Sequence, residues 1–155
     1  MTPLPEAVAT FLAEHHVMTL ATHGDDGPWA AAVFYAHDGG AFDFLSSPET
    51  RHARHLARDP RCAATIQPDV AEWARIRGVQ LEGRVRELSG DDARLAHERY
   101  GRKFPLVADL ASAPRAIALA FAKVRWYRLE ADRLRFIDNR RGFGHRETVE
   151  LRPRA

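Results

Sequence analysis

The sequence predicts an α+β domain built on a six- to seven-stranded antiparallel β-barrel, closed or half-open, with peripheral helices. Three observations lead to this class. The chain has 155 residues and no repeat or linker-like stretch, so we expect a single domain over 1–155. Short strand-forming runs recur along it, separated by turn residues. The helical stretches lie between groups of strands and do not alternate with them, which argues against a parallel βαβ sheet.

The first part of the chain predicts one helix followed by three strands. Apolar residues recur at helical spacing over 5–15. Strand-forming residues then alternate between turns rich in glycine and aspartate. The three expected strands, which we assign to one antiparallel meander, span 17–22, 29–36 and 41–46.

A second helix is expected over 48–59, directly after the third strand. Ser47 is its expected N-cap, Pro48 fits the first helical position, and Pro60 ends it. The helix therefore follows the strand with almost no loop between them.

The remainder of the chain predicts a long strand, two helical stretches and a closing hairpin. Gly78 and Gly83 inside the long strand are expected to mark bulges or close backbone approach. The expected strands are 61–67, 73–88, 123–130 and 134–139, the expected helical stretches are 89–100 and 104–122 with a break at Ala113-Pro114, and the tail 142–151 is extended.

Composition excludes several classes of protein. Hydrophobic residues make up 45% and charged residues 28%, which excludes collagen-like, low-complexity and strongly disordered chains. A single cysteine, Cys62, excludes an internal disulfide framework and a cysteine-based zinc cluster. The first ten residues lack the pattern of a secretory signal, and charged residues interrupt every apolar run. We therefore expect a cytoplasmic protein with no membrane partner.

The positive charge is carried almost entirely by arginine. Lys103 and Lys123 are the only lysines among 23 basic residues, yet the net charge is only +2. That charge is too small for a protein that binds duplexes nonspecifically, so no nucleic-acid partner is expected. A nucleotide bias of the genome explains most of these arginines, and we single out only those in a phosphate-binding context.

The junction between the third strand and the second helix carries the clearest functional signal. Ser46 and Ser47 lead into a helix whose first turn contains Thr50 and Arg51. The free N–H groups and the macrodipole of a helix start attract anions, and hydroxyls and a guanidinium add further donors. This pattern predicts a site for one phosphate group. An ordinary helix cap followed by a solvated arginine-rich face is the alternative.

The histidines and carboxylates do not identify a metal or a catalytic site. His52 and His55 lie three residues apart, but no third ligand follows at a recognised spacing, so no metal is expected. His145 in the tail is placed to reach a site across a dimer. No carboxylate pair or Ser-His-Asp order is present, and the catalytic residues stay unassigned.

Three motifs in a fixed order resemble a known superfamily. The sequence reads S-P-E-T-R-H at 47–52, R-G-V-Q-L-E-G at 77–83 and D-N-R-R-G-F-G at 138–144. Over about 17–146 the chain resembles the pyridoxamine 5′-phosphate oxidase-like, FMN-binding split-barrel superfamily, in particular its small bacterial branch. The resemblance implies a homodimeric FMN-binding flavoprotein. It further implies an oxidoreductase that uses a nicotinamide or similar two-electron donor on a small-molecule substrate.

The resemblance also implies which residues contact FMN. The helix start would hold the phosphate, the strand before it the ribityl chain, and the second strand the isoalloxazine ring. The long strand would approach the flavin, and the tail of the partner subunit would close the site. The implied cofactor-binding residues are Ala31, Ala32, Val33, Tyr35, Leu45, Ser46, Ser47, Thr50, Arg51, His52, Gln80, Asn139 and Phe143.

Several positions depart from the pattern that this superfamily shows. His52 stands in place of a lysine, Ala30 in place of a cation, and Gly78 in place of a glutamine, although Gln80 follows on the same face. Because a histidine charge titrates near neutral pH, we expect FMN to bind less tightly as pH rises through the histidine pKa. The segment 135–137 lacks an Arg-x-His pair, so phosphopyridoxine oxidation is not expected. A cofactor-free or haem-binding module is the alternative function.

Overall fold

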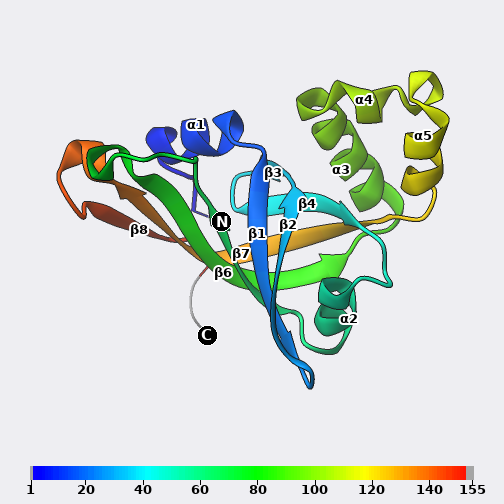
Figure 1. Cartoon of the computed structure of the whole chain (residues 1–155), viewed down its shortest axis with the longest axis horizontal. Coiled ribbons are helices and arrows are strands. Elements are labelled where there is room, and N and C mark those ends of the chain that lie inside the picture. The colour runs from blue at the N-terminus through cyan, green and yellow to red at the C-terminus, as the bar shows by residue number, and fades with distance from the viewer. Residues whose placement is uncertain (1, 153–155) are drawn as a thin grey trace.

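An antiparallel sheet of eight strands curls into a half-barrel in the computed structural model, which describes residues 2–152 (Figure 1). Its strand order is β2-β1-β5-β6-β7-β4-β3, and β8 pairs with β7. The strands are β1 (Val17–Gly24), β2 (Gly27–Phe34), β3 (Ala36–Asp38), β4 (Ala41–Ser46), β5 (Arg61–Ile66), β6 (Arg77–Glu87), β7 (Arg125–Asp138) and β8 (Arg146–Glu150). The helices are α1 (Glu6–Glu14), α2 (Arg51–Arg58), α3 (Gly90–Lys103), α4 (Pro105–Ala108) and α5 (Arg115–Phe121). The predicted α+β split barrel is confirmed.

The concave face of the sheet forms the main core. Buried and exposed residues alternate along β1 and β5, because successive side chains of a strand point to opposite faces. The α1 helix adds Val8, Phe11 and Leu12, all of which are buried. Each fully buried leucine or phenylalanine contributes about 1.5–3 kcal/mol relative to an exposed one. This core fixes the strands whose ends carry the candidate site.

The predicted three-strand meander is wrong in its pairing. β1 pairs with β2 as expected, but β4 pairs with β7 and β3. β3 is a separate three-residue strand between β2 and β4, which raises the strand count above the predicted six to seven. The chain thus crosses from one edge of the sheet to the other between β2 and β4.

The predicted hairpin over 123–139 is also wrong. β7 is a continuous strand of 14 residues, and Ala131 in its middle is buried. The irregularity lies on the neighbouring strand, where the register shifts between Glu82 and Gly83. A Cβ on Gly83 would lie 2.1 Å from the carbonyl oxygen of Glu130, so only glycine fits there. The predicted bulge at Gly83 is confirmed.

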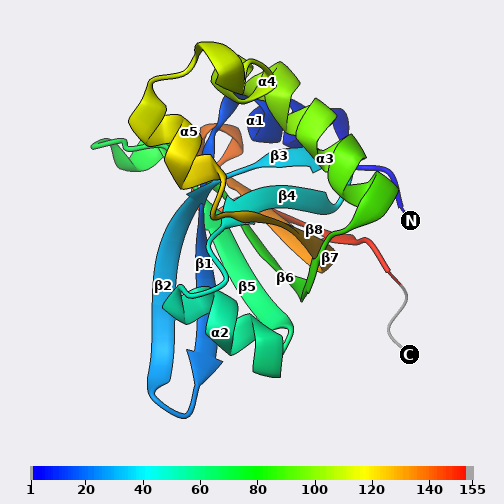
Figure 2. The same ribbon diagram turned by 90° about the vertical axis from the view of Figure 1, so that its right-hand side faces the viewer.

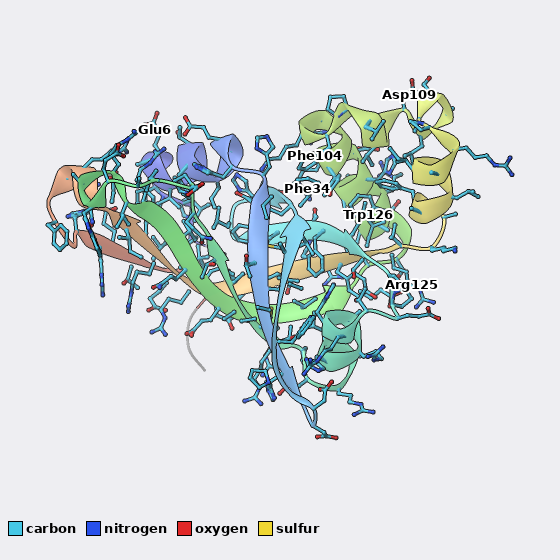
Figure 3. All side chains as sticks on the ribbon, viewed as in Figure 1. Glu6, Phe34, Phe104, Asp109, Arg125 and Trp126 are labelled. Atoms are coloured by element: carbon cyan, nitrogen blue, oxygen red, sulfur yellow. The ribbon has the colours of Figure 1, made fainter. Side chains whose placement is uncertain are left out.

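The helices α3, α4 and α5 form a separate layer over β3 and β4 (Figure 2). Tyr100 and Val107 are buried there, beside Phe104 and Trp126. Phe34 and Phe104 point toward one another between β2 and α3, with ring centroids 5.2 Å apart (Figure 3). Among residues 2–152, no helix is both long and apolar enough to cross a membrane. The cytoplasmic location stays a prediction.

Candidate functional site

The junction between β4 and α2 is built by a turn and a threonine cap. β4 ends at Ser46, and α2 begins at Arg51. The predicted cap at Ser47 and helix start at Pro48 are wrong, since Ser47 Oγ instead accepts from the N–H of Glu49 at 3.3 Å within the turn. Thr50 is the N-cap, and its hydroxyl accepts from the N–H of Ala53 at 3.3 Å. Two backbone N–H groups at the helix start remain without partners inside the helix.

Behind this helix start, three polar side chains form a closed cluster. His52 Nε2 lies 2.7 Å from Ser46 Oγ and 3.2 Å from Thr50 Oγ1. The two hydroxyl oxygens are 3.1 Å apart, and Thr50 also donates to the carbonyl oxygen of Ser47 at 3.0 Å. Ser46 and His52 are buried. The cluster therefore fixes the shape of the turn, and its hydroxyls point toward one another.

Burial determines the charge of His52. It lowers the pKa of the imidazole, and the neighbouring His55 lowers the pKa further. The ring is consequently neutral at pH 7, where Nε2 can accept a hydrogen bond from a hydroxyl. His52 therefore loses its positive charge at a lower pH than a normal histidine. Any contribution of that charge to anion binding is lost at the same lower pH.

Arg51 supplies the permanent positive charge of the junction. Its guanidinium lies over the ring of Trp29, with Cζ 4.5 Å from the centroid. Nη2 donates to the backbone carbonyl of Asp26 at 2.7 Å, and Nε lies 2.9 Å from Asp26 Oδ2. The buried Nε is therefore in ion-pair contact with Asp26, although the angle of this contact is poor for a hydrogen bond. Within residues 2–152, Nη1 makes no hydrogen bond, and this nitrogen is the donor that Arg51 retains at the helix start.

Sequence reasoning missed the acidic partner of Arg51. Asp26 lies in the turn between β1 and β2, and its Oδ1 is 2.6 Å from Nε2 of the buried His55. The opposite ring nitrogen of His55 lies 3.0 Å from Thr22 Oγ1. The acidic turn of Asp25 and Asp26 was visible in the sequence, but its position against α2 follows from how the hairpin packs on the helix.

The residues predicted to line the flavin ring divide between two faces of β2. Ala31 and Val33 pair with Leu20 and Met18, whose side chains are buried, whereas Ala32 pairs with Thr19. Strand alternation therefore turns Ala32 away from the core.

Tyr35 and Leu45 also differ from the predicted arrangement. The structure buries Tyr35 completely, and its hydroxyl donates to the carbonyl oxygen of Leu12 at 2.8 Å. Its ring is enclosed by the core and does not face the junction. Leu45 is half-buried beside Trp126, under α3 and α5.

Gln80 lies on the outward face of β6, in one cross-strand row with Ala32. The pairings that connect them run from Ala32 to Thr19, from Thr19 to Thr65 and from Thr65 to Gln80. Gln80 lines a groove of about 320 Å³ on this face. The outward faces of β2 and β6 are therefore continuous.

The structure does not bring the tail residues to the junction of the same chain. Asn139 Nδ2 donates to the carbonyl oxygen of Trp73 at 2.9 Å, and its Oδ1 accepts from the N–H of Gly144 at 2.9 Å. Phe143 is 79% exposed. The connection between β7 and β8 lies at the left-hand end of the molecule in Figure 1, away from α2, which lies in the right-hand half. Within one chain, these residues therefore lie apart from the helix start.

The histidines do not form a metal centre in the described part of the chain. Within residues 2–152, no three His, Cys, Asp or Glu side chains gather in a group that could hold a metal ion. His145 lies beside Glu147, with Nε2 and Oε1 3.0 Å apart. Cys62 is buried, and burial raises the pKa of its thiol to about 12, so it stays protonated at pH 7.

Comparison with known proteins assigns this chain to a family. A family model described as pyridoxamine 5′-phosphate oxidase matches residues 4–138. The chain therefore belongs to the pyridoxamine 5′-phosphate oxidase family, as the three motifs predicted. Among individual proteins, it is 35% identical over 140 residues to a UPF0306 protein of Klebsiella pneumoniae, covering 89% of this chain and 87% of that protein.

Solved structures share the fold over nearly the whole chain. A heme-binding protein from Mycobacterium smegmatis superposes with a TM-score of 0.72 at 26% identity over 96% of this chain. This chain spans 60% of that protein's length. A conserved hypothetical protein from Mycobacterium tuberculosis gives a TM-score of 0.70 at 24% identity, covering 96% of this chain and 94% of that one.

Proposed function

We propose that this chain is an FMN-binding flavoprotein whose phosphate site is the start of α2. The observation that supports this most directly is Arg51 on the first residue of α2, a guanidinium whose one carboxylate partner, Asp26, is 56% exposed. An ion pair with an exposed carboxylate contributes only about 0–1 kcal/mol, so it does not prevent the guanidinium from binding another anion. A phosphate at the helix start would bind this guanidinium and would also meet the N–H groups of the first helical turn.

The donor set of the junction fits a phosphate monoester. Arg51, the backbone N–H groups of α2 and the hydroxyl of Ser47 would hold the phosphate. The cluster of Ser46, Thr50 and His52 would lie behind these donors without contacting the phosphate, because its hydroxyls and imidazole already bond to one another. Their role is to keep the turn in the shape that exposes the N–H groups.

The isoalloxazine ring would lie along the outward face of β2 beside Ala32, with the backbone of Ala31 and Val33 at its edge and the backbone of Leu45 near the ribityl chain. Gln80 would approach the flavin from the outward face. FMN, when bound, supplies two-electron redox chemistry, and the protein positions the ring and sets the charge around it. The reaction we propose is electron transfer from a nicotinamide or similar donor to a small-molecule acceptor.

We further propose that the active form is a homodimer. The family resemblance implies Asn139 and Phe143 near FMN, and both belong to the connection between β7 and β8, which lies away from α2 within one chain (Figure 1). A partner subunit would bring its own tail to the junction. Sedimentation velocity should therefore give the mass of two chains, and a monomer that still binds FMN tightly would contradict this arrangement.

Haem binding is a second candidate function, favoured by the Mycobacterium smegmatis heme-binding protein at 26% identity. Haem needs an axial ligand, and His145 in the tail is the histidine that would supply it. It is about one-third exposed and adjoins Glu147. This candidate does not use Arg51 or the start of α2, and we therefore place it second.

Absorbance of the purified protein, followed by titration with FMN and haemin, tests both functions. We expect flavin absorption or saturable FMN binding. Arg51→Ala should weaken FMN binding by about tenfold to a hundredfold, because a hydrogen bond to a charged group is worth about 1.5–3 kcal/mol. Arg54→Ala, which removes an exposed arginine from the same helix, is the matched control and should change little. A Soret band with haemin and no response to FMN would establish the second candidate instead.

A further inference from the structure

Asp26 is the one acidic residue that the structure shows in contact with the proposed phosphate-binding arginine. Its carboxylate Oδ2 lies 2.9 Å from Arg51 Nε, and its backbone carbonyl accepts from Arg51 Nη2 at 2.7 Å. The turn between β1 and β2 therefore presents an anionic group to the same guanidinium that would bind a phosphate.

His55 fixes the position of the Asp26 carboxylate. His55 Nε2 lies 2.6 Å from Asp26 Oδ1, and Nδ1 lies 3.0 Å from Thr22 Oγ1. Thr22 and His55 are both buried. A Cβ on Gly24 would lie 2.6 Å from the His55 ring, so the hairpin rests directly on the imidazole. Asp26 is thus held against α2 even though its side chain is 56% exposed.

Asp26 is also negatively charged at neutral pH. The hydrogen bond from His55 is the largest cause that lowers the pKa of its carboxyl, and the charge of Arg51 lowers it further. A phosphate monoester and a carboxylate both bind guanidinium through paired oxygens, so the two compete for the same donors.

We propose that Asp26 is an internal competitor for Arg51 that weakens the binding of phosphate monoesters at the start of α2. This inference rests on the proposed function, because it assumes that FMN phosphate uses Arg51. The incoming phosphate displaces the carboxylate from Nε or shares the guanidinium with it. In either arrangement two negative charges approach each other, and removing one of them strengthens binding.

The neighbouring Asp25 provides a matched control. Its side chain is 99% exposed, and its ion pair is a 3.4 Å contact with Arg58. Asp25→Asn and Asp26→Asn remove the same charge from adjacent positions, but only the second removes the contact with Arg51. Asparagine keeps the oxygen that accepts from His55, so Asp26→Asn preserves the packing of the hairpin.

The experiment compares FMN and riboflavin affinities of wild type, Asp25→Asn and Asp26→Asn by fluorescence titration at low salt. Asp26→Asn should bind FMN about three- to tenfold more tightly than Asp25→Asn, the size expected for one solvent-screened charge a few ångströms away. Riboflavin, which has no phosphate, should bind all three equally. The gain should shrink as salt is added. Asp26→Ser, checked for folding by thermal denaturation, should show the same direction of change.

The outcomes separate this inference from the function on which it rests. If FMN binding depends on Arg51 but Asp26→Asn binds FMN no more tightly than Asp25→Asn, Asp26 is not a competitor for Arg51. The proposal that the chain is a flavoprotein would still stand. Weaker binding would make Asp26 a residue that positions Arg51. If neither wild type nor Asp26→Asn binds FMN, both the proposed function and this inference are wrong.

Discussion

Two arginine-containing clusters adjoin β4, and they differ in how far their charges are satisfied. In the middle of the strand, Asp43 is completely buried and bonds to Arg99 of α3 and Arg128 of β7. Beyond the end of the strand, Arg51 of α2 meets a single carboxylate among residues 2–152, that of Asp26, which is 56% exposed. The first cluster is closed on itself, whereas the second retains donors for a ligand.

The difference shows how to distinguish a structural arginine from one that binds a ligand. Arg128 donates to both oxygens of Asp43, at 2.6 and 3.2 Å, and Arg99 joins Asp43 to Asp38 at 2.8 Å. These bonds connect α3 to β3, β4 and β7, and they use all of the oxygen atoms of Asp43. The number of arginines therefore does not show which of them are structural and which bind a ligand. The partners of each guanidinium determine its role.

The largest effect is expected from opening the closed cluster. Asp43→Asn leaves the largely buried Arg128 without its bonded carboxylate and leaves Arg99 with only the exposed Asp38, so we expect the free energy of unfolding to fall by about 3–5 kcal/mol. Urea denaturation measures this loss. Asp38→Asn, which removes a 71% exposed carboxylate from the same Arg99, is the matched control and should cost no more than about 1 kcal/mol. Equal losses for the two variants would show that the Asp43 cluster is not the structural anchor we describe.

A smaller effect is expected at the helix start. Thr50→Ala removes the N-cap of α2 and one member of the hydroxyl cluster, and should lower the free energy of unfolding by about 1 kcal/mol. FMN affinity should fall as well, because the turn that exposes the helix N–H groups loses its support. Thr50→Ser keeps the hydroxyl and should restore both quantities. If Thr50→Ala weakens neither stability nor FMN binding, the cluster does not shape the site.

The smallest effect concerns acid stability. Because the pKa of His52 is lowered in the folded state, the unfolded chain binds more protons than the folded chain as pH falls below about 6.5. Wild type should therefore lose stability on acidification, and His52→Gln should lose less over the same pH range. Thermal denaturation at pH 7 and pH 5 measures the difference. A steeper loss in His52→Gln would mean that the buried imidazole gains a proton more readily than the unfolded one.

The sequence predicted the fold class correctly and indicated the β4–α2 junction as the candidate site. Local patterns carry that information, since alternation marks the strands and the resemblance of 47–52 marks the β4–α2 junction. Strand partners were harder to predict. The local sequence Ala131-Asp132-Arg133 predicts a turn, yet this segment continues β7. The irregularity lies instead on the neighbouring strand, where the register shifts at Gly83.

The details of the candidate site depended on contacts that no local pattern contains. Tyr35 lies close to the junction in sequence, but strand alternation and α1 place its ring in the core. The N-cap is Thr50 and not the predicted Ser47, because Ser47 Oγ accepts from the N–H of Glu49 within the turn that precedes the helix. The contact between Asp26 and Arg51 joins residues 25 positions apart and requires the hairpin to pack on α2.

The ratio of FMN to riboflavin affinity in Arg51→Ala tests the central claim most directly. The two ligands share the ring and the ribityl chain and differ by the phosphate, so their ratio isolates the anion site. We predict that wild type and Arg54→Ala prefer FMN by at least about tenfold and that Arg51→Ala loses most of this preference while binding riboflavin as before. An unchanged preference for FMN in Arg51→Ala would contradict the assignment of the α2 start as the phosphate site.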